Sequence, residues 1–206
     1  MSTHQENTSE RILKAAEEEF MNKGFAGAKT VVIARKAGVT HAMLHYYFRT
    51  KEMLFDRVLD DKICCLAEGV VQALQTPGRT FQERLAEGVA RHFDFLAAHP
   101  SLARFVVNEV ISKPERLVMV QRTLGGVLRI IVEHTQQEID ELVARGEMVP
   151  MRMEDLLLDL VSLNAFLFIA LPAMEPFVLR EGETREEFLE RRKQENIEVI
   201  LRRIKP

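Results

Sequence analysis

Apolar residues recur at helical spacing along almost the whole chain, and no segment sustains the strict alternation that is typical of a half-buried β-strand. Ile12, Ala16 and Phe20 repeat every four residues, which places them on one face of a helix. A longer stripe with similar spacing comprises Phe81, Leu85, Val89, Phe93 and Leu96. The pattern predicts an all-α protein.

Turn-forming residues divide this pattern into about nine expected helices. The main boundary residues are Gly24, Gly38, Pro77-Gly78, Pro100, Pro114 and Gly146. The eighth helix is expected to run from about Met153 to Leu171, because Pro172 cannot donate a backbone hydrogen bond. A connection to Gly182 and a ninth helix from about Thr184 to Ile204 follow. The polar residues 1–10 are expected to form a loose arm, with Ser9 capping the first helix.

The residue types argue against catalysis and against a membrane span. The chain contains no HExxH motif, no paired CxxC motifs and no glycine-rich phosphate loop, so we expect no enzymatic activity, metal or cofactor. Cys64 and Cys65 are adjacent and cannot readily bridge each other, which suits a reducing cytoplasm. The longest apolar stretch contains Asp159 and Asn164, so a buried helix is favoured over a transmembrane one.

Charge is distributed unevenly along the chain. Residues 1–51 contain eight Lys and Arg against five acidic residues, a net charge of +3. The remainder contains 20 basic and 26 acidic residues, a net charge of −6. This asymmetry favours an N-terminal module that faces an anion and a C-terminal body that faces water.

The segment from Thr30 to Phe48 reads as two short helices joined by a tight turn that contains Gly38. Its apolar members, Ile33, Ala34, Ala37, Val39 and Leu44, are spaced to pack the two helices on each other. This is the pattern of a helix-turn-helix, in which the second helix lies in the major groove of DNA. Helical hairpins with glycine turns also occur in bundles that bind no DNA.

Polar residues lie where such docking needs them. Thr30 and Thr40 are expected at helix N-termini, where hydroxyl groups, backbone N–H groups and the helix dipole all favour phosphate. His45, Tyr46 and Tyr47 supply further donors one turn later. Lys29 and Lys51 bracket the segment with positive charge, and Lys51 is expected in the first turn of the fourth helix.

An ordered series of residues surrounds and includes this segment. Its members are Arg11-Ile12-Leu13, Ala15-Ala16, Phe20, Gly24-Phe25, Thr30, Ile33-Ala34, Ala37-Gly38-Val39-Thr40, Leu44, Tyr47-Phe48, Lys51-Glu52 and Leu54. The series resembles the N-terminal signature of TetR-family transcriptional regulators and covers residues 9–58. Beyond it, the chain resembles that family only in having about five further helices of suitable length.

The resemblance implies roles for individual residues. Thr30, His45, Tyr46, Tyr47 and Lys51 would hold phosphates, and Thr40, His41, Ala42 and Met43 would face base edges. Three positions depart from the family pattern: His45 stands where Tyr is common, Ala42 where Gly is frequent, and Met43 where a small hydroxyl residue is frequent. The last two make the reading face more apolar and favour contact with thymine methyl groups.

The rest of the chain is expected to bind a ligand and a second subunit. We expect a helix-turn-helix domain over residues 1–51 and a helical domain over residues 52–206. The eighth and ninth helices would form the dimer surface, through Phe166, Leu171, Phe188, Val199, Ile200 and Ile204 among others. The candidate ligand contacts are His92, Phe93, Phe105, Asn108, His134 and Phe166. For the polar members, a structural role is the alternative.

These patterns favour a cytoplasmic, dimeric regulator that binds a palindromic DNA operator, represses transcription and is released by a small apolar ligand. An all-helical carrier of hydrophobic ligands without DNA binding is the alternative. Activation in place of repression also stays open, because the sequence says nothing of where the operator lies.

Overall fold

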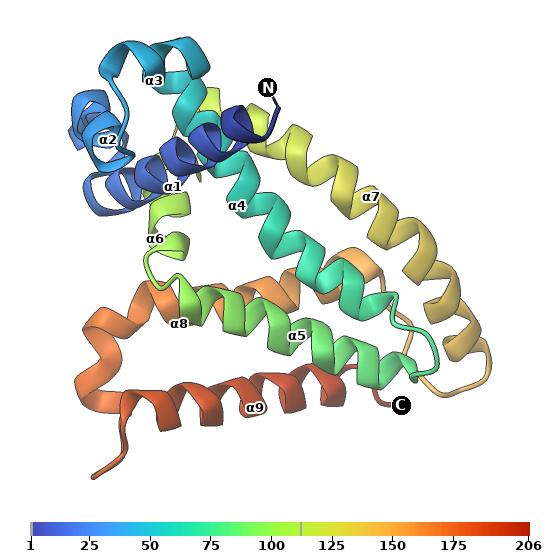
Figure 1. Ribbon diagram of the computed structural model, residues 1–206. Helices are drawn as coiled ribbons and strands as arrows, with labels where there is room; N and C mark the ends of the chain where they lie inside the picture. The colour runs from blue at the N-terminus through green and yellow to red at the C-terminus, as the bar shows by residue number, and fades with distance from the viewer. Residues whose placement is uncertain (1, 112) are drawn as a thin grey trace. The chain divides into compact units, whose positions relative to one another are not determined.

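The structure is a computed structural model that describes residues 2–111 and 113–206, and all regular elements in them are helical (Figure 1). The prediction of an all-α protein is confirmed. The elements are α1 (Ser2–Gly27), α2 (Thr30–Lys36), α3 (His41–Tyr47), α4 (Lys51–Leu74), α5 (Phe81–Ala98), α6 (Leu102–Val106), the π-helix η1 (Val107–Ile111), α7 (Pro114–Ala144), α8 (Met153–Val178) and α9 (Arg185–Arg203).

The chain divides into two compact units. The first comprises Met1–Ile63 and Phe105–Val120, and the second comprises Cys64–Arg104 and Gln121–Pro206. By their bounds, α4 and α7 each contribute residues to both units.

The core of the first unit forms where the apolar stripe of α1 packs against α2 and the start of α4. Ile12, Phe20, Ile33, Leu44 and Leu54 are fully buried. Aromatic contacts extend this core, because Phe20, Phe25 and Phe55 lie edge to face or stacked with ring centroids 5.0–6.3 Å apart.

Gly24 interrupts α1, as the sequence predicted. Its φ of 65° and ψ of 178° lie outside the helical region, in backbone conformations that essentially only glycine adopts. The expectation of a loose N-terminal arm is wrong for the described residues, because α1 begins at Ser2 and therefore includes Ser9 within the helix.

The second unit is built on α5, which packs against both α8 and α9. Its core cluster combines residues from α4, α5, α7, α8 and α9, among them Leu85, Val89, Ile139, Leu156 and Ile200. Thr80 begins α5 with a capping box, in which its hydroxyl accepts from the Glu83 backbone N–H and Glu83 accepts from the Thr80 backbone N–H. This boundary was predicted correctly.

Helix α8 is longer than the sequence pattern indicated. It continues through Pro172 and Pro176 to Val178, so the predicted end at Leu171 is wrong. The two prolines lie four residues apart on one side of the helix, which lets the helix bend there rather than stop. Figure 1 shows the bend near the C-terminal end of α8.

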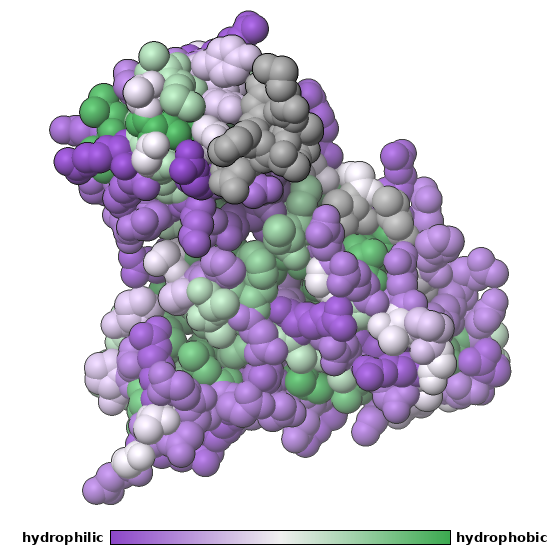
Figure 2. All heavy atoms as spheres, viewed as in Figure 1, coloured by the Kyte–Doolittle hydropathy of each residue, from purple (hydrophilic) through white to green (hydrophobic). Residues whose placement is uncertain are grey.

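Helix α8 also exposes much apolar surface. Leu158, Val161, Phe166, Met174 and Phe177 are all exposed. Within the described residues α8 is the helix long and apolar enough to cross a membrane by length and composition alone, a test that core helices of soluble proteins also pass. Hydrophilic side chains dominate the surface drawn in Figure 2, and hydrophobic ones form separate patches.

Candidate nucleic-acid interface

Helices α2 and α3 pack through small and apolar side chains across the turn that joins them. Ile33 and Leu44 are fully buried, and Ala34 and Ala37 are nearly so, which lets the two backbones approach closely. Gly38 occupies the turn with a φ of 66°, and the Val39 N–H donates to the carbonyl oxygen of Ala34 at 3.0 Å. The turn therefore needs a residue that tolerates positive φ, and glycine does so without strain.

The N-terminal turn of α3 presents its side chains to solvent. Thr40 caps the helix, since its hydroxyl oxygen accepts from the Met43 backbone N–H at 3.1 Å. His41, Ala42 and Met43, the predicted base-reading residues, are all exposed. Because Leu44 anchors the opposite face of α3 in the core, this exposed face is held in a fixed orientation.

The predicted phosphate anchors all belong to the first unit, as this face does. Lys29 is exposed and precedes α2, and Thr30 is the first residue of that helix. Tyr46 is 73% exposed, whereas Tyr47 is half-buried and packs edge to face against it. Lys51 is half-buried, with its ammonium 4.7 Å from the ring centroid of Phe25. A cation held over an aromatic ring loses less conformational entropy when it meets a phosphate.

Two histidines of α3 and one hydroxyl of α2 form a cluster on the exposed face. His41 Nε2 lies 3.0 Å from Thr30 Oγ1 and 3.2 Å from His45 Nε2. His45 Nδ1 lies 3.1 Å from the carbonyl oxygen of Arg49. The two imidazole rings stand edge to face with centroids 4.4 Å apart. The sequence placed these residues on one surface but did not predict that they bond to one another.

Ion pairs of Lys36 join α2 to α1, and a further pair lies within α1. Lys36 pairs with Glu18 at 2.8 Å and with the buried Glu19 at 3.4 Å, and Lys23 pairs with Glu19 at 2.7 Å. The hydrogen bond from Lys23, with smaller help from Lys36, holds the pKa of Glu19 below its usual value despite burial. Lys23 and Lys36, which belong to the eight basic residues before position 52, are therefore already paired.

A second cluster supports the end of α1, and no sequence pattern indicated it. The Arg116 guanidinium lies 4.2 Å from the Phe25 ring centroid and 4.3 Å from that of Phe55. It donates to the Glu109 carboxylate at 2.7 Å, and Lys113 donates to the same oxygen at 2.8 Å. Burial raises the pKa of Glu109, but these two cations and the Phe25 backbone N–H outweigh it, so the pKa lies below its usual value.

The six candidate ligand contacts do not lie in one place. Phe105 and Asn108 belong to the first unit, where Phe105 packs against Phe55 with ring centroids 5.5 Å apart. In the second unit, His134 is exposed and lines a cavity of about 70 Å³, and Phe166 lines a separate groove between α8 and α9. His92 and Phe93 are buried in the core of that unit.

His92 belongs to a buried polar network that the sequence did not predict as a unit. Its Nδ1 lies 3.1 Å from Nδ2 of Asn164, which also donates to the carbonyl oxygen of Val89 at 3.0 Å. Asn196 donates to Asn164 Oδ1 at 2.9 Å, and both asparagines are fully buried. Burial lowers the pKa of His92 to about 4, so the ring is neutral near pH 7.

No group of three or more His, Cys, Asp and Glu side chains in residues 2–111 and 113–206 is arranged to hold a metal ion.

Two short helices packed across a glycine turn, with the second exposing its N-terminal face, define a helix-turn-helix protein. The family model of bacterial regulatory proteins of the tetR family matches residues 12–58. An uncharacterised HTH-type transcriptional regulator of Bacillus subtilis, YdgC, is 38% identical over 137 residues, or 63% of this chain and 70% of that protein. The chain belongs to the tetR family of bacterial regulatory proteins.

The names of two further relatives describe one repressor and one activator. The transcriptional repressor NicS of Pseudomonas putida is 29% identical over 137 residues, 64% of each chain. The transcriptional activator FasR of Mycolicibacterium smegmatis is 31% identical over 136 residues, 66% of this chain and 58% of that protein. This chain thus spans less than two thirds of the length of these two relatives. The names of these proteins describe regulators and not enzymes.

Solved structures support the same fold over the whole length. A TetR family transcription regulator from Marinobacter aquaeolei has a TM-score of 0.68 and covers 100% of this chain and 99% of its own, at 17% identity. The likeness therefore extends to the C-terminal helices, where sequence resemblance is weak.

Proposed function

We propose that this protein is a DNA-binding transcriptional regulator without catalytic activity that acts in the cytoplasm as a dimer on a palindromic operator. The observation that carries the proposal is the exposed N-terminal face of α3, which is anchored by Leu44 and flanked by hydroxyl and basic groups. A carrier of hydrophobic ligands would have no use for this face. Selection of DNA fragments by the purified protein tests the proposal, and the absence of any enriched sequence would refute it.

The proposed phosphate contacts are Lys29, Thr30, Tyr46, Tyr47 and Lys51. Lys51→Ala should weaken binding to all DNA sequences and lower the slope of log affinity against log salt by about 0.9 for each phosphate charge that the protein no longer neutralises. Lys205→Ala is the matched control, because Lys205 is an exposed lysine at the far end of the sequence. An unchanged salt slope for Lys51→Ala would remove Lys51 from the set of phosphate-binding residues.

Dimerisation is proposed to use a groove between α8 and α9. It is lined by Leu163, Phe166, Leu167, Ala170, Met174 and Phe188 among others. Phe166 is 66% exposed and lies among other apolar side chains of the groove, and a contiguous exposed apolar patch of this kind marks an interaction surface. Phe188 lines this groove although it is largely buried, whereas Ile200 and Ile204 are buried within the chain itself and are not part of the proposed surface.

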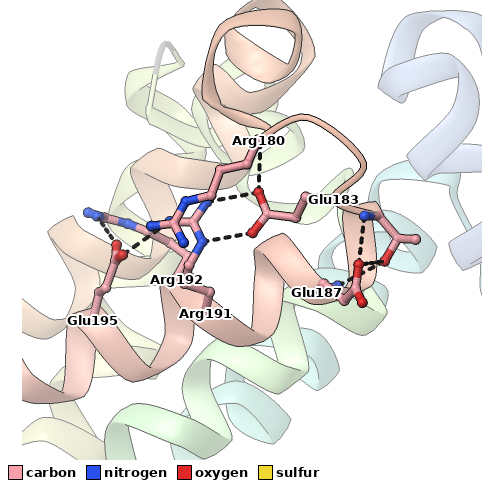
Figure 3. Close-up of polar contacts among 7 residues, drawn as sticks. Arg180, Glu183, Glu187, Arg191, Arg192 and Glu195 are labelled. Atoms are coloured by element: carbon pink, nitrogen blue, oxygen red, sulfur yellow. Dashed lines mark hydrogen bonds and ion pairs between the residues drawn. The ribbon is translucent and has the colours of Figure 1, made fainter.

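Ion pairs join charged side chains at the rim of this groove (Figure 3). Arg191 pairs with both oxygens of Glu183, at 2.7 and 3.0 Å, and Arg191 and Arg192 both pair with Glu195. A negative charge at position 166 would oppose association through this apolar groove, so Phe166→Glu should give a monomer in sedimentation experiments. Val118→Glu, at a side chain that is 59% exposed on α7 and outside the groove, should leave the dimer intact.

The resemblance to the tetR family also leads us to propose that a small apolar effector releases the protein from DNA. Helix α4 would connect the effector site to the DNA-binding surface, because its residues belong to both units. In the second unit, Val71, Leu74 and Ile131 line the cavity beside His134. Its volume of about 70 Å³ is well below the roughly 300 Å³ of small-molecule sites. An effector that binds there would select a more open conformation. Dissociation of selected DNA by apolar molecules of graded length tests this step.

Repression is the proposed mode, as for NicS, although FasR is named as an activator. A reporter gene placed behind the selected DNA sequence distinguishes the two modes. Reporter output should fall when the protein is expressed, and a rise would show activation.

A further inference from the structure

The histidine cluster on α3 has a defined direction of hydrogen bonding. A carbonyl oxygen can only accept, so His45 Nδ1 carries a proton and donates it to the Arg49 oxygen. In the neutral ring, His45 Nε2 is then an acceptor that faces His41 Nε2 at 3.2 Å. Two lone pairs repel each other at that distance, so His41 Nε2 must carry the proton between them.

The hydroxyl of Thr30 is compatible with this assignment. It lies 3.0 Å from His41 Nε2 and can accept a share of the same N–H while keeping its own proton to donate elsewhere. With a proton on Nε2, the neutral ring of His41 keeps a lone pair on Nδ1. The contacts that join the His41 ring to Thr30 and to His45 both use Nε2, which leaves the Nδ1 edge turned away from them.

We propose that His45 is a positioning residue that fixes His41 in the Nε2-protonated form, so that His41 reads the DNA through Nδ1 as a hydrogen-bond acceptor. His41 is the first residue of α3 and is exposed, and residues at this end of a recognition helix meet base edges. In the major groove the amino groups of adenine and cytosine are the donors, whereas guanine and the oxygen of thymine accept. His41 therefore selects adenine or cytosine on the strand that it faces.

This proposal rests on the proposed DNA-binding function and changes the role of one residue within it. Both nitrogens of the His45 ring have partners inside the protein, the Arg49 carbonyl and the His41 ring. His45 is therefore not a phosphate contact, in contrast to the role that the family resemblance implied for it.

The first experiment needs no DNA. Long-range ¹H–¹⁵N spectra of the full chain at about pH 8, above the titration range of an ordinary imidazole, identify the protonated nitrogen of each ring. The expected result is a proton on Nδ1 of His45 and on Nε2 of His41. His45→Leu should release His41 into a mixture of both forms. A proton on His41 Nδ1 in the unaltered protein would overturn the proposal.

The second experiment selects binding sites from a random double-stranded DNA library. At one position of each half-site, the unaltered protein should bind guanine and thymine about two- to tenfold more weakly than adenine or cytosine, which is the effect of one neutral hydrogen bond. His45→Leu should abolish this preference and leave the salt slope unchanged, and His45→Gln, whose amide can replace both hydrogen bonds, should restore it. Tyr46→Phe is the control, which should weaken binding uniformly.

The outcomes separate the two proposals. A uniform decrease in affinity with a lower salt slope in His45→Leu would make His45 a phosphate contact and overturn the positioning role. If the unaltered protein enriches no DNA sequence, the proposed function fails. The spectra alone then decide whether His45 fixes the protonated nitrogen of His41.

Discussion

Replacing Gly24 by alanine tests how α1 is joined to the cluster around Glu109. A Cβ at this position would lie 2.5 Å from Oε1 of Glu109, and the φ of 65° is unfavourable for any side chain. Glu109 cannot simply swing aside, because its carboxylate is held by Lys113, by Arg116 and by the Phe25 backbone N–H. Backbone strain of about 1–3 kcal/mol and disruption of charge-assisted hydrogen bonds worth about 1.5–3 kcal/mol give about 3–6 kcal/mol of destabilisation.

Urea unfolding followed by circular dichroism measures this destabilisation. Gly125→Ala is the matched control, because Gly125 lies within α7 with no atom near its Cβ position, and it should stabilise the protein by about 0.5–1 kcal/mol. In a Glu109→Ala background, Gly24→Ala should cost only the strain of about 1–3 kcal/mol. An equal cost in both backgrounds would refute the proposed clash with Glu109.

Three further predictions concern the second unit. Because the pKa of His92 is about 4 when folded and about 6.5 when unfolded, the unfolded state takes up a proton first as the pH falls, so stability is lost between these values. From about pH 7 to about pH 5, the unaltered protein should lose about 2 kcal/mol more than His92→Gln in urea titrations, and parallel curves would contradict the burial of a neutral ring. Asn164→Leu should cost about 2–4 kcal/mol because it removes the partner of His92 and one of the two acceptors of the Asn196 amide, and a cost below about 1 kcal/mol would show that the network adds little. Thr184→Ala should lower the free energy of unfolding by about 1 kcal/mol by removing the capping box with Glu187, and Thr184→Ser should restore it.

The helix-turn-helix could be predicted from the sequence because its determinants are local. The turn glycine at 38, the Thr40 cap and the spacing of Ile33 and Leu44 all lie within a few residues of one another. The exposed position of His41, Ala42 and Met43 follows directly from the burial of Leu44 on the other side of the same helix.

The parts that could not be predicted depend on contacts between distant segments. Arg116 stacks on Phe25 and Phe55, and no spacing rule connects three residues so far apart in the sequence. The pairing of Asn164 with Asn196 and His92 likewise requires α5, α8 and α9 to be packed first. The candidate ligand residues were chosen because they include polar residues on apolar helix stripes. That pattern indicates buried polar groups, but it does not indicate where a cavity lies.

The two prolines of α8 have a consequence for how its last turns hold together. Pro172 and Pro176 each lack an N–H, so the carbonyl oxygens of Phe168 and Pro172 have no helical donor four residues on. Residues 172–178 therefore form a segment of low local stability, which opens before the rest of the helix. This same segment carries Met174 and Phe177, the latter 80% exposed. In a dimer that covers this face, association would suppress the opening, and cleavage by a protease near residue 177 would become slower as the protein concentration rises.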